Sequence, residues 1–291
     1  MPRDVLAEIA DRVLVCEGPM GSQLSAHGIS LRSSAEANLT HPETVVLIHK
    51  GYLEAGAQVL QTNTFAANPH MLARAGLAEA GPRIWREALR LCCEAAGEQA
   101  IVAATGGPTG GLLEPLGDLT AEDVRASTRQ QFEVLLGPEV DFVLLEGFEA
   151  LDEAEASIQG VRDVDPAVPL AVTLCFSSPT GRTSMGLDAR TAAARRCELG
   201  VQIIGAGCGT PEGLEEAIRQ MGDACDRPLM AQANAGVPEV VAGETVWRMS
   251  PSEAGQLAAR LIGCGVRIVG ACCGATPDHI RQIARAAAAV A

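Results

Sequence analysis

Three cysteines lie where apolar, β-branched segments change into segments that can begin a helix. Cys208 falls in Val-Gln-Ile-Ile-Gly-Ala-Gly-Cys-Gly-Thr-Pro over 201–211, and Cys272 and Cys273 fall in Arg-Ile-Val-Gly-Ala-Cys-Cys-Gly-Ala-Thr-Pro over 267–277. The glycine and Thr-Pro pair after the cysteines are typical of a strand that ends just before a helix. Thiolates are preferred ligands of zinc, and three protein ligands with an open fourth position are typical of catalytic zinc. We therefore predict that Cys208, Cys272 and Cys273 bind one Zn²⁺ ion.

The net charge of a zinc ion with three thiolate ligands determines which reactions it can promote. Zinc surrounded by three thiolates is negative overall, so it is a poor Lewis acid for activating water. It can still bind a substrate thiol and favour the loss of the thiol proton, which leaves a sulfur able to attack an alkyl carbon. We therefore predict alkyl transfer to a thiol rather than hydrolysis, with the three cysteines acting in catalysis through the zinc.

The ten cysteines of the chain do not all point to a metal. A free cysteine is often a buried packing residue, and this is the alternative for the triad as well. Cys92 and Cys93 fall inside a helix pattern, where adjacent side chains point apart, so we predict that they pack. Packing is also predicted for Cys197, Cys225 and Cys264. The triad differs because its members share a strand-end position and glycine neighbours.

The elements that would position these cysteines alternate regularly along the chain. Eight apolar segments without polar alternation are typical of parallel strands covered on both faces. Helix patterns lie between them, for example over 42–55, 80–97, 120–136, 188–199, 211–221 and 251–262. This pattern predicts an α/β fold, a (β/α)8 TIM barrel with its active site at the C-terminal ends of the strands. No composition break divides residues 1–291, so we expect a single domain. The eight predicted strands are 13–18, 57–65, 100–107, 141–148, 169–176, 201–208, 228–236 and 266–274.

Polar residues gather at the predicted C-terminal ends of these strands, beside long loops over 19–41, 108–119, 177–187 and 237–249. Asn63, Thr105 and Asn234 are candidates to line a pocket there. Glu146 ends an apolar strand, where a carboxylate is costly unless it meets a cation, so it is a candidate receiver for a substrate ammonium group. The alternatives for Glu146 are a solvated rim position or an ion pair with an arginine. The histidines are predicted to be structural or exposed rather than metal ligands.

The composition of the chain argues against nucleic-acid binding and against membrane association. A formal charge of −14 argues against nucleic acid as a partner, because phosphate binding needs clustered Lys and Arg. No apolar run reaches the roughly 18 residues that span a bilayer, and the N-terminus lacks the apolar centre of a signal peptide. We therefore expect no membrane association and a cytoplasmic location. We separately expect a monomer or weak dimer as the oligomeric state.

Several stretches resemble the homocysteine S-methyltransferase family, the zinc barrel of cobalamin-dependent methionine synthase's first domain, betaine–homocysteine methyltransferase and S-methylmethionine-dependent enzymes. The resemblance implies zinc on Cys208, Cys272 and Cys273. It also implies that Glu146, with backbone near Glu17 and Gly18, holds the amino group of an amino-acid thiol such as homocysteine. The matching stretches are 17–24, 38–43, 52–57, 61–65, 140–146, the Cys208 segment and 270–280.

Three positions depart from the family pattern: Glu17 replaces an aspartate, Pro19 a small residue and Gly207 an asparagine. Because of these departures, the acceptor could be a thiol related to homocysteine rather than homocysteine itself, or the protein could serve a specialised demethylation pathway. The methyl donor is predicted to be a corrinoid, as methylcobalamin or on a separate corrinoid protein, or a small onium compound. A quaternary ammonium usually needs an aromatic cage, and aromatic residues make up only 3% of this chain. The alternatives are a betaine- or S-methylmethionine-dependent homocysteine methyltransferase without a protein partner, and a non-catalytic zinc-binding barrel with a regulatory role.

Overall fold

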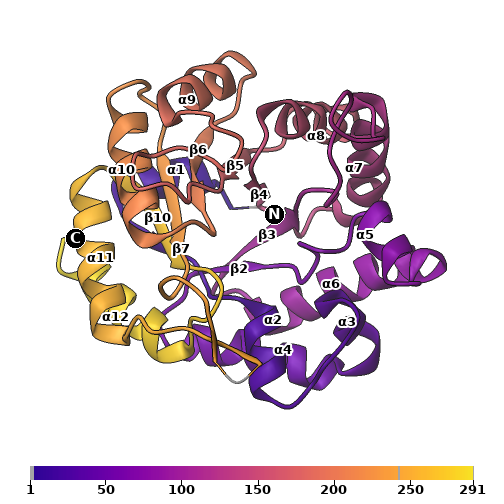
Figure 1. Ribbon diagram of the computed structural model, residues 1–291. Helices are drawn as coiled ribbons and strands as arrows, with labels where there is room; N and C mark the ends of the chain where they lie inside the picture. The colour runs from indigo at the N-terminus through magenta and orange to yellow at the C-terminus, as the bar shows by residue number, and fades with distance from the viewer. Residues whose placement is uncertain (1–2, 242, 291) are drawn as a thin grey trace.

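A ring of parallel strands forms the centre of the molecule (Figure 1). The computed structural model describes residues 3–241 and 243–290. The eight strands follow the order β1-β10-β7-β6-β5-β4-β3-β2, and a parallel bridge between Cys16 and Val59 joins the two ends of that order. The predicted (β/α)8 barrel is therefore confirmed. Its strands are β1 Leu14–Val15, β2 Val59–Gln61, β3 Ile101–Gly106, β4 Phe142–Phe148, β5 Leu170–Leu174, β6 Ile203–Gly207, β7 Leu229–Ala233 and β10 Val266–Ala271.

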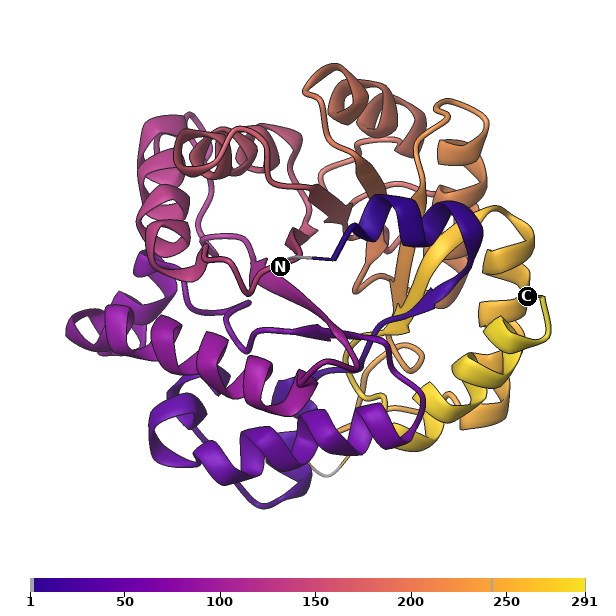
Figure 2. The same ribbon diagram turned by 180° about the vertical axis from the view of Figure 1, so that it is seen from behind.

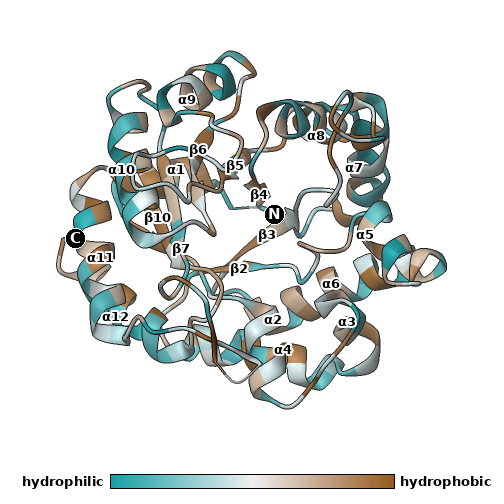
Figure 3. Ribbon diagram, in the orientation of Figure 1, coloured by the Kyte–Doolittle hydropathy of each residue, from teal (hydrophilic) through white to brown (hydrophobic). Residues whose placement is uncertain are grey.

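Helices surround the strands, and several of them begin with a side-chain cap. Ser250 and Glu253 form a capping box at the start of α11 (Pro251–Gly263), and Thr120 and Asp123 form another at the start of α7 (Ala121–Leu135). In Figure 3 the strands are largely brown, whereas much of the teal lies on the surrounding helices. The outer helices are α4 Pro42–Glu54, α6 Gly81–Ala96, α7 Ala121–Leu135, α8 Leu151–Val164, α9 Ala189–Glu198, α10 Pro211–Gly222, α11 Pro251–Gly263 and α12 Pro277–Ala288.

The apolar core has two layers, which explains why the strands are apolar throughout. In β3, Ile101 and Ala103 belong to the cluster inside the barrel, whereas Val102 and Ala104 belong to the larger cluster between barrel and helices. Successive side chains of a strand point to opposite faces, so both faces need apolar residues here.

A short helix, α1 Val5–Asp11, closes the N-terminal end of the barrel (Figure 2). Its Val5 and Ile9 side chains are fully buried and belong to the cluster inside the barrel. The sequence did not predict this helix, because seven residues are too few for a clear period. With this end closed, substrates must reach the barrel from the opposite end.

Two predicted loops contain regular structure. The 19–41 segment holds α2 Met20–Ala26 and α3 Ala37–Thr40, and the 237–249 segment holds an antiparallel hairpin of β8 Glu239–Val241 and β9 Glu244–Val246. A further short helix, α5 Pro69–Arg74, follows β2. These elements have three to seven residues each, so tertiary contacts rather than periodicity determine them.

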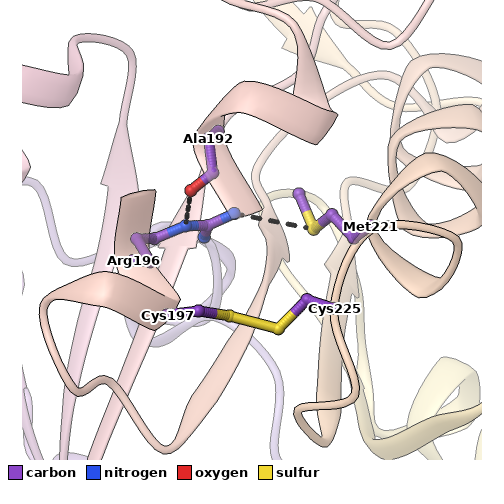
Figure 4. Close-up of a disulfide and its surroundings, with 5 residues drawn as sticks. All are labelled: Ala192, Arg196, Cys197, Met221 and Cys225. Carbon is purple, nitrogen blue, oxygen red and sulfur yellow. Dashed lines mark hydrogen bonds between the residues drawn. A yellow bond between two sulfur atoms is a disulfide. The ribbon is translucent and has the colours of Figure 1, made fainter. Parts of the chain in front are cut away.

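The prediction that Cys197 and Cys225 only pack is wrong, because the structure joins them in a disulfide (Figure 4). They are separated by 28 residues, and cysteine spacing alone does not reveal such a pairing.

Beside the disulfide lies Arg196, a fully buried arginine of α9. Its Nη1 donates to the Val172 carbonyl of β5 at 2.7 Å and to the Gly205 carbonyl of β6 at 3.0 Å. Burial lowers the pKa of Arg196 to about 9. The guanidinium links the two strands three residues before Cys208.

Over the described part of the chain, no helix combines the length and apolar character needed to cross a membrane.

We expect Ile9→Ala to lower the free energy of unfolding by about 2–5 kcal/mol, because the truncation leaves a cavity under the barrel. Denaturant titration followed by circular dichroism measures this loss. Leu6→Ala on the same helix is the control, since Leu6 is only partly buried, and it should cost less. Equal losses in the two variants would contradict the role of α1 in closing the barrel.

Candidate metal and substrate site

The three predicted zinc ligands converge at the C-terminal end of the barrel. Cys208 follows β6, and Cys272 and Cys273 follow β10, with β7 between them. The Cys208 and Cys272 sulfurs lie 2.7 Å apart, and the Cys272 and Cys273 sulfurs lie 3.9 Å apart. Strand β7 forms backbone hydrogen bonds with both cysteine segments. The Cys208 backbone N–H donates to the Gln232 carbonyl, and the Cys272 backbone N–H donates to the Ala233 carbonyl.

Cys208 adopts an unusual backbone conformation. Its φ of +62° makes it the sole non-glycine residue with positive φ in the described ranges. Residues with a Cβ rarely adopt this left-handed backbone conformation, and they keep it only where surrounding contacts enforce it. Asn234 supplies one such contact, since its Nδ2 donates to the Cys208 carbonyl at 2.5 Å. The Asn234 Oδ1 atom is buried and has no hydrogen-bond partner among the described residues.

Of the two sulfur–sulfur distances given above, one matches the spacing expected around zinc and the other is too short. Tetrahedral zinc with Zn–S bonds of about 2.3 Å separates its sulfurs by about 3.8 Å. The Cys272–Cys273 distance of 3.9 Å matches that spacing, whereas Cys208 must move roughly 1 Å away from Cys272. As it stands, the described chain contains no group of three His, Cys, Asp or Glu side chains in metal-binding geometry. The donor set suits zinc once that one sulfur shifts.

Without a cation the thiols resist ionisation. The hydrogen bond with Cys208, together with burial, raises the pKa of Cys272 well above its usual range. The hydrogen bond with Cys272, again with burial, raises the pKa of Cys273. Metal binding must therefore displace these protons, which makes zinc affinity depend on pH.

A cavity of about 320 Å³ extends from the sulfurs into the mouth of the barrel. Two carboxylates lie in its wall, together with side-chain amides and the first turn of α2. The residues that line it include Glu17, Gly18, Pro19, Met20, Gln61, Asn63, Phe65, Glu146, Cys208, Gln232, Cys272 and Cys273.

Glu17 is held by two partners that sequence analysis did not identify. Its Oε1 accepts from the Gln61 backbone N–H at 2.6 Å, and its Oε2 lies 2.9 Å from His49 Nδ1. His49 is fully buried in α4, and its Nε2 has no partner among the described residues. The sequence places His49 only in a helix pattern, which carries no signal of this contact.

Within the described residues, Glu146 has neither a histidine nor a backbone N–H beside its carboxylate, and the Gln61 side-chain amide is the hydrogen-bond donor next to it. Burial and the nearby negative charge of Glu17 raise the pKa of Glu146 to about 7, although the Gln61 amide opposes this shift. Near neutral pH the carboxyl is therefore partly protonated. An ammonium group in the cavity would restore its charge.

Gly18 shapes the neighbouring wall through a close approach. A β-carbon there would lie 2.7 Å from the Tyr52 hydroxyl oxygen, and this hydroxyl donates to the Pro19 carbonyl at 3.0 Å. The position therefore requires glycine, which leaves the Gly18 backbone open to the cavity.

The structure brings together most, not all, of the predicted site residues. Glu17, Gly18, Asn63 and Glu146 line the cavity with the three cysteines. Thr105 and Asn234 do not line it. The Thr105 backbone pairs with the hydroxyls of Thr62 and Thr64 inside the barrel wall, whereas Asn234 braces Cys208.

Of the aromatic residues, Phe65 lines the cavity. Phe148 and Phe176 are fully buried. Trp247 packs against Gly274, where a β-carbon would lie 2.1 Å from the indole Cγ. The described residues thus provide one ring at this cavity rather than a cage.

Comparison with known proteins supplies independent findings. The sequence profile of the homocysteine S-methyltransferase family matches residues 14–287. Methionine synthase of Mycobacterium leprae is 30% identical over 98% of this chain and 25% of its own length. Betaine–homocysteine S-methyltransferase 1 of Danio rerio is 30% identical over 86% of this chain and 66% of its own length. The chain thus spans about a quarter of the methionine synthase.

The fold also matches solved structures. The metallated form of the homocysteine methyltransferase MmuM from Escherichia coli superposes with a TM-score of 0.81, at 22% identity, over 97% of this chain and 99% of that one. At this identity the likeness concerns the barrel fold.

Glu146 should make the metal-free protein less stable as pH rises. The folded protein keeps a proton that the unfolded chain releases near pH 4.5, so stability falls as pH rises from there through about 7. We expect Glu146→Gln to remove about 3 kcal/mol of this loss, measured by denaturant unfolding between pH 5 and 8 with chelator present. Glu149→Gln, at an exposed neighbouring position, is the control. A Glu146→Gln protein with the wild-type pH profile would contradict the raised pKa.

Proposed function

We propose that this chain, which belongs to the homocysteine S-methyltransferase family, transfers a methyl group to the thiol of a homocysteine-type acceptor. The observation that supports this activity best is that three cysteine thiols and two carboxylates share one cavity. Sulfur ligands suit a soft metal, and carboxylates suit an ammonium group. An amino-acid thiol carries both complementary functions, a sulfur and an ammonium group.

Cys208, Cys272 and Cys273 would hold Zn²⁺. Zinc in this ligand set binds a thiol and lowers its pKa, so that the sulfur becomes a nucleophile at neutral pH. Asn234 steadies Cys208 through its carbonyl, and strand β7 holds the backbone of both cysteine turns.

The carboxylates orient the acceptor. Glu146 receives the ammonium group, because its own charge is otherwise uncompensated in the cavity. Glu17, fixed by His49 and the Gln61 backbone, adds negative charge on the same side. With its amine held there, the acceptor directs its sulfur toward the cysteines.

Methyl transfer then proceeds by displacement. The acceptor thiol gives up its proton to solvent water, and its sulfur forms the new bond to the methyl carbon. The bond between that carbon and the donor atom breaks, and its electron pair leaves with the donor.

Two kinds of donor remain candidates. A corrinoid would be carried by a separate protein and would present its methyl group at the mouth of the cavity. A small onium donor would enter the site itself, as in a betaine- or S-methylmethionine-dependent enzyme. The name of the Danio rerio relative favours the onium class, because betaine is a quaternary ammonium compound.

Cys273→Ala should cost the protein most of its zinc and lower methyl transfer by about 100-fold or more. Metal analysis and a homocysteine assay with S-methylmethionine, glycine betaine and methylcobalamin measure the two effects. Cys93→Ala, half-buried on α6, is the matched control and should keep both. If zinc is lost while transfer continues, the zinc mechanism is wrong. If the wild type transfers methyl from none of the donors, a non-catalytic zinc barrel is favoured.

His49→Leu should raise the KM for homocysteine about tenfold with a smaller change in kcat, because Glu17 loses a charge-assisted hydrogen bond. His49→Asn should restore most of the affinity, since its amide nitrogen can replace Nδ1. The same variants should be compared on 4-mercaptobutanoate, which lacks the amino group. If His49→Leu raises the KM for both thiols by the same factor, the substitution does not act through recognition of the ammonium group.

A further inference from the structure

A second cavity, of about 260 Å³, lies between α3, α4 and α6 on the outer side of the barrel. These three helices pack against one another (Figure 1). Helix α3 belongs to the 19–41 segment, which also contributes Met20 and Ser34 to the wall of the cavity beside the sulfurs. The residues that line the second cavity are Asn38, Leu39, Pro42, Arg83, Arg86 and Glu87.

Two arginines of α6 give this cavity a positive charge. Arg83 and Arg86 are exposed, and neither forms an ion pair or a side-chain hydrogen bond within the part of the chain that the structure describes. Glu87, the acid in the lining, pairs instead with Arg90, whose Nε lies 2.9 Å from Glu87 Oε2. The cavity is therefore positive, although the formal charge of the chain is −14.

The surroundings of Arg86 differ from those of other helical arginines. Arg219 lies 2.6 Å from Glu216, and Arg90 lies 2.8 Å from Glu94, at helical spacings that let opposite charges meet. Arg86 has no acid at such a spacing, because positions 82, 83, 89 and 90 hold Pro, Arg, Leu and Arg. Like charges at these spacings destabilise a helix. An anion in the cavity would remove this repulsion.

The chemistry of the lining favours a phosphate group. A guanidinium presents its N–H donors as a planar fork that matches the oxygens of a phosphate or a carboxylate. A carboxylate has a single charge and suits one such fork, whereas a phosphate dianion has enough charge and oxygens for the forks of both Arg83 and Arg86. Leu39 and Pro42 form an apolar wall, which suits the organic part of a phosphate ester.

Asn38 connects this cavity to the cavity beside the sulfurs. Its Nδ2 donates to the Asn63 carbonyl at 3.0 Å, and its Oδ1 accepts from Asn63 Nδ2 at 3.0 Å. Asn38 lines the second cavity, and Asn63 lines the first. Helix α3 has only four residues, so tertiary contacts must hold it in place. An anion bound between α6 and α3 would fix Asn38 and, through it, Asn63.

We propose that the cavity between α3, α4 and α6 binds a phosphate dianion, free or as a phosphate monoester, and that the bound anion strengthens acceptor binding. Arg83 and Arg86 donate hydrogen bonds to the phosphate oxygens, and the Asn38–Asn63 pair transmits the effect to the acceptor cavity. Binding is reversible and no covalent bond changes. The effect on the acceptor rests on the proposed methyl transfer, whereas the anion site does not.

Calorimetry on the purified protein tests the anion site directly. Inorganic phosphate is the probe, titrated at constant ionic strength, and acetate is the comparison with a single charge. The wild type should bind phosphate more tightly than acetate. Phenyl phosphate separates the two sources, because a monoester ligand predicts tighter binding than free phosphate through Leu39 and Pro42. Failure to bind phosphate, or equal binding of acetate, would overturn the site.

Charge variants locate the bound phosphate. Arg83→Ala and Arg86→Ala should each weaken phosphate binding about tenfold, because each removes charge-assisted hydrogen bonds. Glu87→Gln should strengthen binding, since it removes the acid from the lining. Arg227→Ala is the matched control, because Arg227 is an exposed arginine that precedes β7 at the opposite end of the barrel. Equal effects of Arg86→Ala and Arg227→Ala would overturn the assignment.

Homocysteine titrations with and without phosphate test the link between the two cavities. Phosphate should tighten homocysteine binding to the zinc-loaded wild type about fivefold or more, and it should have no effect on the Arg83→Ala, Arg86→Ala double variant. If phosphate binds through both arginines yet leaves homocysteine affinity unchanged, the link through Asn38 is wrong and the anion site stands. If the protein binds no homocysteine and methylates no thiol, the proposed activity fails, and the phosphate titrations still decide the anion site.

Discussion

Uncompensated negative charge is the constraint around which this barrel end is built. Glu17, Glu146 and three cysteines share a largely apolar cavity, and they cannot all ionise there without cations. The structure shows the result, since the pKa values of Glu146, Cys272 and Cys273 are all raised. A divalent metal at the sulfurs and an ammonium group at the carboxylates would remove this cost together. The same need for cations explains why a metal and an amino-acid thiol suit one site.

The rest of the fold keeps that charge in place. Parallel strands bring residues from distant parts of the chain to one edge, so cysteines 64 residues apart meet there. Arg196 links β5 and β6 below Cys208 through backbone carbonyls, and the disulfide beside it joins α9 to the segment after α10. At the other end, α1 covers the barrel interior with Val5 and Ile9. Rigid strands thus support short loops that carry the chemistry.

Much of this arrangement follows from the sequence, because strands buried on both faces and capped helices leave strong local signals. The eight barrel strands and the cysteine positions at their ends are of this kind. Features that depend on tertiary contacts leave no such signal. His49 sits in an ordinary helix pattern, yet it meets Glu17 from 32 residues away. Thr105 and Asn234 end strands as predicted, but the direction of each side chain depends on register within the barrel. The short helix α1 and the Cys197–Cys225 disulfide were not predicted, because both also depend on tertiary contacts.

The contact between Trp247 and Gly274 has an optical consequence. The indole ring packs on the residue that follows Cys272 and Cys273, at a position with φ of +81° that admits no side chain. The chain's other tryptophan, Trp85, is buried on α6, and its Nε1 donates to the Ala67 carbonyl. Any shift of the cysteine turn therefore changes the surroundings of one indole and leaves the other as an internal reference. Intrinsic fluorescence can thus follow the turn that carries two of the sulfurs without an added label.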